Sequence, residues 1–252
     1  MSTTEKAPSN GRCPVRNLAF CSCFTEDELS QLEQISRHVR IGKNELLFYE
    51  GEPAEYAYLL YQGCIKLSKD LPDGRCEIVD FKLPTGFLGL INSGQYAYTA
   101  EAVKESVVCR ILRSDLQKLY RKNPEIEDKI LNLVSEELNA AMSQMLLLGR
   151  MTAVEKLVTF LLTFAERCKR LGLSNSHINL PMGRHDIADY LGLTTESVSR
   201  IFSRLKEDGF VNLPTRHEII IHDKEKLQNL LKMEESELKR YGKGKTPIEK
   251  LK

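Results

Sequence analysis

The stretch Gly183–Gly209, GRHDIADYLGLTTESVSRIFSRLKEDG, predicts two short helices joined by a tight turn. Gly192 lies at the turn, where a glycine commonly ends a helix. Thr194 follows two residues later, at the position of an N-cap for the second helix. The second helix has two chemically different faces, and this difference guides the interpretation of the whole chain.

One face of the second helix is apolar, and its residues recur at the i, i+3, i+4, i+7 spacing of a buried stripe: Val198, Ile201, Phe202 and Leu205. The other face carries short or fork-shaped hydrogen-bonding side chains instead of the long lysines and glutamates of a solvated helix. We take its polar residues as candidate DNA contacts: Thr194, Thr195, Glu196, Ser199, Arg200 and Ser203. Such groups suit base edges in a major groove. The alternative is an ordinary amphipathic surface helix.

A strand, a turn and a second strand follow the two helices. The strands are expected at 210–213 and 218–221, and the turn at 214–217. This arrangement indicates a wing. Arg216 or His217 at its tip either contacts phosphate or is solvated.

Residues 190–205, YLGLTTESVSRIFSRL, resemble the recognition region of the CRP/FNR superfamily of bacterial transcription regulators, in its FNR and FixK branch. In that branch a Glu-x-x-Ser-Arg motif reads a TTGA-type half-site. Glu196, Ser199 and Arg200 match this motif. The resemblance implies a homodimer that binds double-stranded DNA and has RNA polymerase as a partner.

Upstream of this region, short apolar runs punctuated by glycines predict a compact antiparallel barrel or roll. The expected strands are 46–49, 56–61, 65–67, 78–81, 98–103 and 107–111, separated by Gly51, Gly63, the turn at 72–74, and Gly86. The resemblance implies a cyclic-nucleotide-binding-type β-roll, which makes the fold α+β. Nucleotide-binding members of that family carry a glycine–glutamate pair for the ribose in the corresponding loop and, further on, an arginine for the phosphate. Here no carboxylate adjoins Gly86 and the stretch 87–99 contains no arginine, so cyclic AMP is not expected as the effector.

From Pro124 onward the pattern is helical, and it contains a heptad seam. The seam residues are Leu131, Val134, Leu138, Ala141, Met145 and Leu148. A second set of apolar residues on this helix, Leu133, Met142 and Leu147, is expected to pack on the roll. Two apolar faces indicate that the seam meets a second copy of the chain, as suits a reader of two-fold symmetric DNA.

The cysteines near the N-terminus form a further candidate site. The segment CPVRNLAFC resembles the cluster-binding segment of the oxygen-sensing FNR branch, in which four cysteines hold a [4Fe–4S] cluster. Cys13, Cys21 and Cys109 match the second, third and fourth of those ligands, whereas Asn10 stands in place of the first, and an amide is a poor iron ligand. Cys23 is the alternative to the missing first ligand. A labile cluster, a regulator that works without one, and a zinc site remain as other interpretations.

The other cysteines, Cys64, Cys76 and Cys168, are interpreted as packing residues. No Cys-x-x-Cys pair or nucleotide fingerprint is present to support an enzyme. A sensor of a small molecule is a further alternative. Haem is not favoured as that molecule, because His38 is the only histidine near the predicted roll that could bind its iron.

Composition limits these interpretations further. The net charge is +1 and the DNA-binding segment is not basic, so the case for DNA depends on the helix face. The polar N-terminus and the lack of a long apolar stretch predict a cytoplasmic protein without a membrane span. We expect five parts: a cysteine-containing segment (1–24), a sensory roll (25–121), a dimerisation helix (122–152), a winged helix-turn-helix domain (153–230) and a charged tail (231–252).

Overall fold

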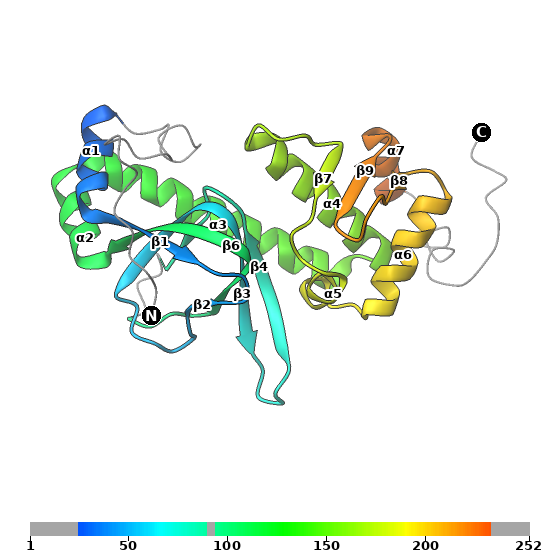
Figure 1. The fold of residues 1–252 in the computed structure, drawn as a ribbon, viewed down its shortest axis with the longest axis horizontal. Coiled ribbons are helices and arrows are strands. Elements are labelled where there is room, and N and C mark those ends of the chain that lie inside the picture. The colour runs from blue at the N-terminus through cyan, green and yellow to red at the C-terminus, as the bar shows by residue number, and fades with distance from the viewer. Residues whose placement is uncertain (1–24, 90–93, 233–252) are drawn as a thin grey trace. The chain divides into compact units, whose positions relative to one another are not determined.

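The computed structural model describes residues 25–89 and 94–232 (Figure 1). The predicted cysteine-containing segment and most of the predicted tail lie outside these residues. The chain forms two compact units, which divide between Ala140 and Ala141, inside one long helix. The predicted separation of a dimerisation helix from the domains on either side stays a prediction.

The first unit begins with α1 (Glu26–Ile35), which has a capping box at its N-terminus. The Thr25 side chain accepts a hydrogen bond from the backbone N–H of Glu28, and the Glu28 carboxylate accepts one from the N–H of Thr25 at 2.6 Å. Leu29 and Leu32 are buried on the inner side of the helix.

The roll is a six-stranded antiparallel sheet whose main path runs β1-β6-β3-β4, with β2 paired to β6 and β5 paired to β3. Figure 1 shows β3 and β4 extending away from the rest of the roll as a long hairpin. The strands are β1 (Ser36–Ile41), β2 (Leu46–Phe48), β3 (Tyr56–Asp70), β4 (Cys76–Lys82), β5 (Phe87–Leu88) and β6 (Thr99–Leu112). The predicted fold class, α+β with an N-terminal roll, is confirmed.

The prediction that Gly63 separates two strands is wrong. Gly63 lies inside β3, where the register against β6 shifts and the backbone adopts φ +110°. A Cβ at this position would lie 2.1 Å from Oγ of the fully buried Ser106, so glycine is required because the two strands approach too closely for a side chain. The two runs predicted at 98–103 and 107–111 likewise form the single strand β6.

The sequence did not predict β1, the first strand of the roll, or α2 (Arg113–Lys122), which follows its last strand. β1 alternates exposed and buried residues over only six positions, and α2 buries only Leu116 and Leu119. Short elements with few buried positions give weak periodic signals.

The long helix α3 (Pro124–Arg150) has 27 residues and confirms the predicted helix. Its first part packs on the roll through one stripe: Ile126 is fully buried, and Ile130 and Leu133 are half-buried against α1 and β6. This confirms the predicted packing of Leu133. Met142, however, is 53% exposed, so its predicted packing on the roll is wrong. Leu147 is buried but belongs to the second unit.

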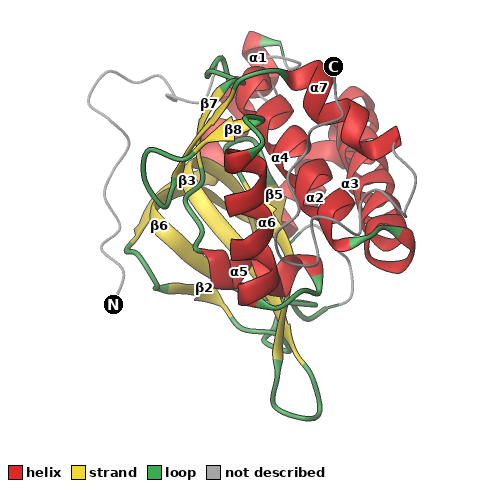
Figure 2. Ribbon diagram, turned by 90° about the vertical axis from the view of Figure 1, so that its right-hand side faces the viewer, coloured by secondary structure: helices red, strands yellow, loops and turns green. Residues whose placement is uncertain are grey.

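The second unit contains α4 (Ala153–Arg170), the two predicted helices and a small sheet of order β7-β9-β8. The two predicted helices are α5 (Arg184–Leu191) and α6 (Thr195–Glu207), and the strands of the sheet are β7 (His177–Asn179), β8 (Val211–Asn212) and β9 (Glu218–Ile221). The described part of the unit ends with α7 (Lys224–Asn229) and the 3-10 helix η2 (Leu230–Lys232). In Figure 2, α6 and α5 are seen as two short helices beside this sheet. The strands predicted on either side of the wing turn are confirmed as β8 and β9; β7 and α7 were not predicted.

Among the described residues, no helix is both long enough and apolar enough to cross a membrane.

Candidate nucleic-acid interface

The apolar stripe of α6 builds the helix into the second unit. All four of its predicted members are buried: Val198, Ile201, Phe202 and Leu205. Thr194 caps the helix, since its Oγ1 accepts a hydrogen bond from the backbone N–H of Ser197 at 3.1 Å. Gly192 ends α5 in the left-handed conformation at φ +59°. The helix-turn-helix geometry therefore follows from the residues that the sequence analysis identified.

The polar stripe of α6 faces away from the core of the second unit. The predicted contacts Glu196, Ser199, Arg200 and Ser203 are all exposed, Thr194 is exposed, and Thr195 is half-buried. None of these side chains is buried in the protein's own interior. The stripe therefore offers one guanidinium, one carboxylate and several hydroxyl groups to an external partner.

Ser197 was not among the predicted contacts, and it connects two of them. Its Oγ accepts a hydrogen bond from Thr194 Oγ1 at 3.0 Å and a long one from Arg200 Nη2 at 3.5 Å. The i, i+3, i+6 spacing of these three residues was visible in the sequence. The spacing alone did not single out Ser197, because serine side chains commonly make local hydrogen bonds near a helix N-terminus.

Arg184, the first residue of α5, was also missed. Its guanidinium lies over the ring of Phe202, 3.2 Å from the ring centroid. Within the described part of the chain, its Nη1 is buried without a hydrogen-bond partner. Burial lowers the pKa of Arg184 to about 10, and the side chain still carries its charge at neutral pH. A cation at the positive end of a helix, without a carboxylate beside that nitrogen, favours an anion as its partner.

The predicted wing tip lies between β8 and β9, and its residues 214–217 are exposed. His217 Nδ1 lies 2.9 Å from the carbonyl oxygen of Leu180, so one of its ring nitrogens is engaged within the unit. Arg216 is exposed and remains the better candidate of the two for a phosphate contact.

The predicted dimer seam on α3 is mostly exposed. Leu131, Val134, Leu138 and Met145 are 56%, 45%, 55% and 72% exposed, Ala141 is exposed, and Leu148 is half-buried. Met142 and Leu146 extend the exposed apolar surface, at 53% and 65%. Large apolar side chains in one continuous stripe are typical of a protein–protein contact.

The C-terminal end of α3 is attached to the helix-turn-helix. Gln144 Nε2 donates a hydrogen bond to the carbonyl oxygen of Tyr190 in α5 at 3.0 Å. Leu148 Cδ2 lies 3.8 Å from the place where a Cβ on Gly192 would be. A displacement of this end of α3 would therefore act directly on α5.

Of the predicted cluster ligands, only Cys109 lies in the described residues. It is 3% exposed and packs in an apolar group with Leu29, Leu32 and Ile126. Within that part of the chain, no three side chains of His, Cys, Asp or Glu come together as a metal site. The fit of a cluster thus depends on a buried thiol beneath α1 and on Cys13, Cys21 and Cys23, which lie outside. Cys64 and Cys168 are buried as predicted; Cys76 is exposed at the start of β4, so packing does not account for it.

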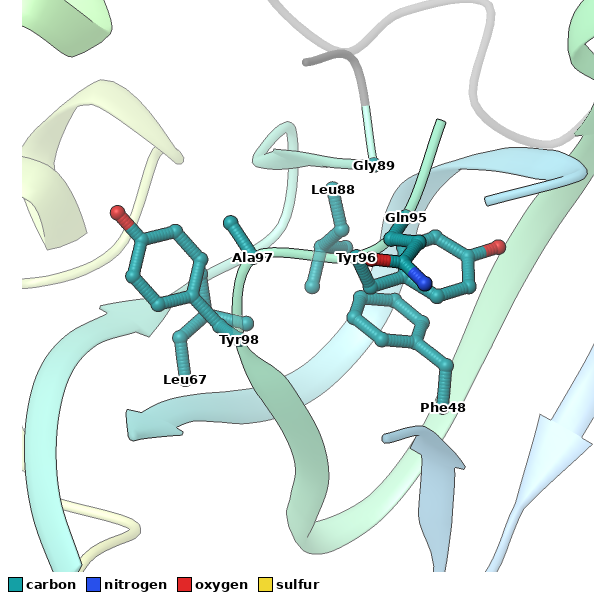
Figure 3. A pocket seen from close by; sticks show the side chains of 8 residues that line it. All are labelled: Phe48, Leu67, Leu88, Gly89, Gln95, Tyr96, Ala97 and Tyr98. Atoms are coloured by element: carbon teal, nitrogen blue, oxygen red, sulfur yellow. The ribbon is translucent and has the colours of Figure 1, made fainter. Parts of the chain in front are cut away.

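The loop expected to distinguish nucleotide-binding relatives leads into buried apolar residues. Phe87 and Leu88 follow Gly86 and form β5. Nearby, the rings of Phe48 and Tyr96 stack with centroids 3.8 Å apart, and Figure 3 shows them side by side. The cavity beside them is about 30 Å³, room for little more than water, and the described residues that line it are uncharged.

An aromatic cluster fills this part of the roll. The Tyr96 hydroxyl donates a hydrogen bond to the carbonyl oxygen of Tyr56 at 2.9 Å, and burial together with a hydrogen bond to Tyr96 raises the pKa of Tyr58. The described residues that line the cavity therefore do not themselves supply a cation for a phosphate.

A roll of this type followed by a helix-turn-helix with an exposed polar helix face defines a DNA-binding regulator. Residues 38–123 match the family model of the cyclic nucleotide-binding domain, and residues 155–230 match that of the Crp-like helix-turn-helix domain. The chain belongs to the CRP/FNR family of transcription regulators, in its FNR/FixK branch. It is a DNA-binding regulator and not an enzyme.

Several characterised relatives support this assignment. The chain is 38% identical to the transcriptional activatory protein AadR of Rhodopseudomonas palustris over 210 residues, which cover 83% of this chain and 88% of that protein. It is 38% identical to the nitrogen fixation regulation protein FixK of Bradyrhizobium diazoefficiens over 199 residues, covering 79% and 84%. The solved structure of FixK2 from Bradyrhizobium japonicum superposes with a TM-score of 0.74 at 36% identity, covering 78% and 97%.

Proposed function

We propose that this regulator reads TTGA-type palindromic promoter sites through the exposed face of α6. Arg200 supplies the fork that pairs with guanine O6 and N7, Glu196 accepts from cytosine N4, and Ser199 contacts either base. Thr194, Thr195 and Ser203 extend the same face. The exposure of this face, above a buried apolar stripe, is the observation that carries the proposal.

Arg184 is proposed as a phosphate contact that complements these base contacts. Its guanidinium is fixed over Phe202, next to the N-terminus of α5, and its buried Nη1 has no partner among the described residues. A backbone phosphate would supply the missing acceptor. Such a contact positions the protein but does not distinguish sequences.

The seam on α3 is proposed to pair with the seam of a second copy. Spacings of three and four residues alternate along it, so the surface is self-complementary as a parallel coiled coil requires. Two copies present two α6 helices to half-sites about 34–36 Å apart, one turn of the duplex. RNA polymerase is the proposed further partner, by family resemblance alone.

A gel-shift titration tests the DNA proposal. The probes are a TTGA palindrome, the same duplex with each guanine replaced, and a scrambled duplex, at one fixed salt concentration. We expect binding to the palindrome at least 1000-fold tighter than to the scrambled duplex. Equal binding to all three probes would remove the proposal.

The proposed signal is oxygen or redox state, which the regulator would sense through Cys13, Cys21, Cys109 and Cys23. Bound there, a [4Fe–4S] cluster would supply an oxygen-labile link between the N-terminal segment and the roll. The support is limited to the resemblance of that segment and to the position of Cys109 beneath α1, which starts three residues after Cys23. Iron content and the visible spectrum of anaerobically purified protein test this proposal.

A regulator that works without a cluster is the second candidate, favoured by Asn10 and by the identity to FixK. It predicts no iron and the same gel shift with and without oxygen. A sensor of an organic effector is less supported, since the cavity beside Phe48 and Tyr96 has a volume of only about 30 Å³ within the described residues.

A further inference from the structure

Lys82, at the end of β4, is a buried lysine that forms an ion pair with a glutamate of α3. The residue is only 8% exposed. Its Nζ lies 2.8 Å from Asp80 Oδ2 on the same strand and donates a hydrogen bond to Glu137 Oε2 on α3. Burying a lysine is unfavourable unless its charge is paired, and the two carboxylates meet that requirement.

The ammonium group stays charged in this setting. Burial alone would lower the pKa of Lys82, but the charges of Asp80 and Glu137 outweigh burial and raise the pKa above its usual value. The Lys82 ammonium is therefore charged at neutral pH, as its contact with the Glu137 carboxylate requires.

Glu137 continues the stripe of α3 that faces the roll. Ile126, Ile130 and Leu133 precede it at spacings of four, three and four residues, so the four side chains lie on one side of the helix. Lys129 adds a second charged contact on this side, since its Nζ lies 2.8 Å from the Glu28 carboxylate of α1. Two ion pairs and an apolar stripe thus hold this part of α3 on the roll.

The seam lies beside this stripe. Val134 precedes Glu137 by one helical turn, and Leu138 is the next residue, about 100° further around the helix. Apolar contacts are non-directional and tolerate a rotation of the helix about its axis. A hydrogen-bonded ion pair is directional, so it fixes that rotation.

We infer that Lys82 is a positioning residue for dimerisation: by holding Glu137, it sets the rotation of α3 at which the seam faces its partner. The inference rests on the proposed dimer. It assigns the buried lysine a role in assembly in addition to any role in the stability of the roll.

The test uses full-length Glu137→Gln, Lys82→Met and the double variant, with dimer dissociation constants from sedimentation equilibrium. Glu137→Gln is the principal variant, because the Glu137 side chain is 45% exposed and its replacement leaves the core intact. We expect each single change to weaken the dimer by about 10-fold, and the double variant to be no weaker than the worse single variant. Glu50→Gln is the matched control, since it removes the ion pair with Lys69 on another part of the roll.

Thermal unfolding of the same samples separates assembly from stability. If Lys82 has a purely structural role, Lys82→Met will have a lower melting temperature, and Glu137→Gln will keep the wild-type dimer dissociation constant. That result would overturn the inference without contradicting the proposed dimer. Additive effects of the two changes would also overturn it, because Glu137 would then act on the partner directly. A monomeric wild-type protein would remove the proposed dimer together with this inference.

Discussion

The helices α3 and α6 each present a regular stripe of exposed side chains, and the two stripes differ in chemistry. On α3 the exposed stripe consists of large apolar side chains such as Leu131 and Leu138. On α6 it consists of serines, a glutamate and an arginine above a buried stripe of equal regularity. Exposed apolar surface favours a protein partner, whereas short hydrogen-bonding groups on a capped helix suit base edges. Helical spacing identifies both elements, but only the chemistry of the outer face separates their roles.

The largest effect is expected from a charge in the apolar face. Leu138→Glu should raise the dimer dissociation constant by about 1000-fold or more. Each copy loses a leucine whose burial in the proposed interface is worth about 2–3 kcal/mol, and gains an unpaired carboxylate. Sedimentation equilibrium and a gel shift on the full palindrome measure this loss. Asn132→Glu, an equal charge on another side of α3, is the control. A dimer that survives Leu138→Glu would show that α3 does not form the interface.

The next effect concerns the polar face. Arg200→Ala should reduce discrimination at one guanine by about 1–3 kcal/mol, or about 5- to 150-fold, and leave binding to duplexes that lack this guanine nearly unchanged. Competition gel shifts with single-base variants of the palindrome measure the change. An equal loss of affinity on every sequence would instead mean that Arg200 contacts phosphate. Arg200 would then give no support for base reading by the polar face of α6.

Arg184→Ala provides the complementary result. We expect about a 5-fold loss on all sequences alike, and a slope of log affinity against log salt that is smaller by about one per copy, since one phosphate contact disappears. Lys206→Ala serves as a control on α6 itself, because it removes an exposed cation at the C-terminal end of that helix and leaves Arg184 and the proposed base contacts in place. Sequence-dependent losses in Arg184→Ala would show that α5 also takes part in base reading.

The sequence predicted the elements that repeat over several turns and missed those defined by single contacts. The buried stripe of α6, the N-cap Thr194 and the length of α3 followed from periodicity and capping chemistry. The role of Gly63 did not, because only the close approach of Ser106 on a distant strand requires a glycine there. Lys82 and Glu137 are 55 residues apart in the sequence, and Arg184 of α5 contacts Phe202 of the next helix, α6. One sequence without coordinates contains no signal for such pairings.

The smallest effect on dimerisation and DNA binding is expected from replacing Glu28. This residue links α1 to α3 but belongs neither to the polar stripe of α6 nor to the seam, so its replacement should change mainly the stability of the fold. Burial alone would raise the pKa of this carboxyl, but hydrogen bonds from Lys129 and Thr25 outweigh burial and lower it. A carboxylate whose pKa is lower in the folded state adds stability above the unfolded pKa, and this stability is lost as the pH falls through the folded pKa. The wild-type free energy of unfolding should therefore decline below about pH 4.5.

Glu28→Gln removes this contribution, so its stability should decline less steeply over the same acidic range while its stability at pH 7 is lower than that of the wild type. Urea titrations at several pH values measure both quantities. Glu101→Gln, which breaks the ion pair of Lys66 on the roll away from α3, is the matched control. Identical pH dependence in the wild type and Glu28→Gln would mean that the Thr25–Glu28–Lys129 contact does not stabilise the attachment of α1 to the dimerisation helix. The apolar group around Cys109 would then be the better candidate for the connection between α1 and α3.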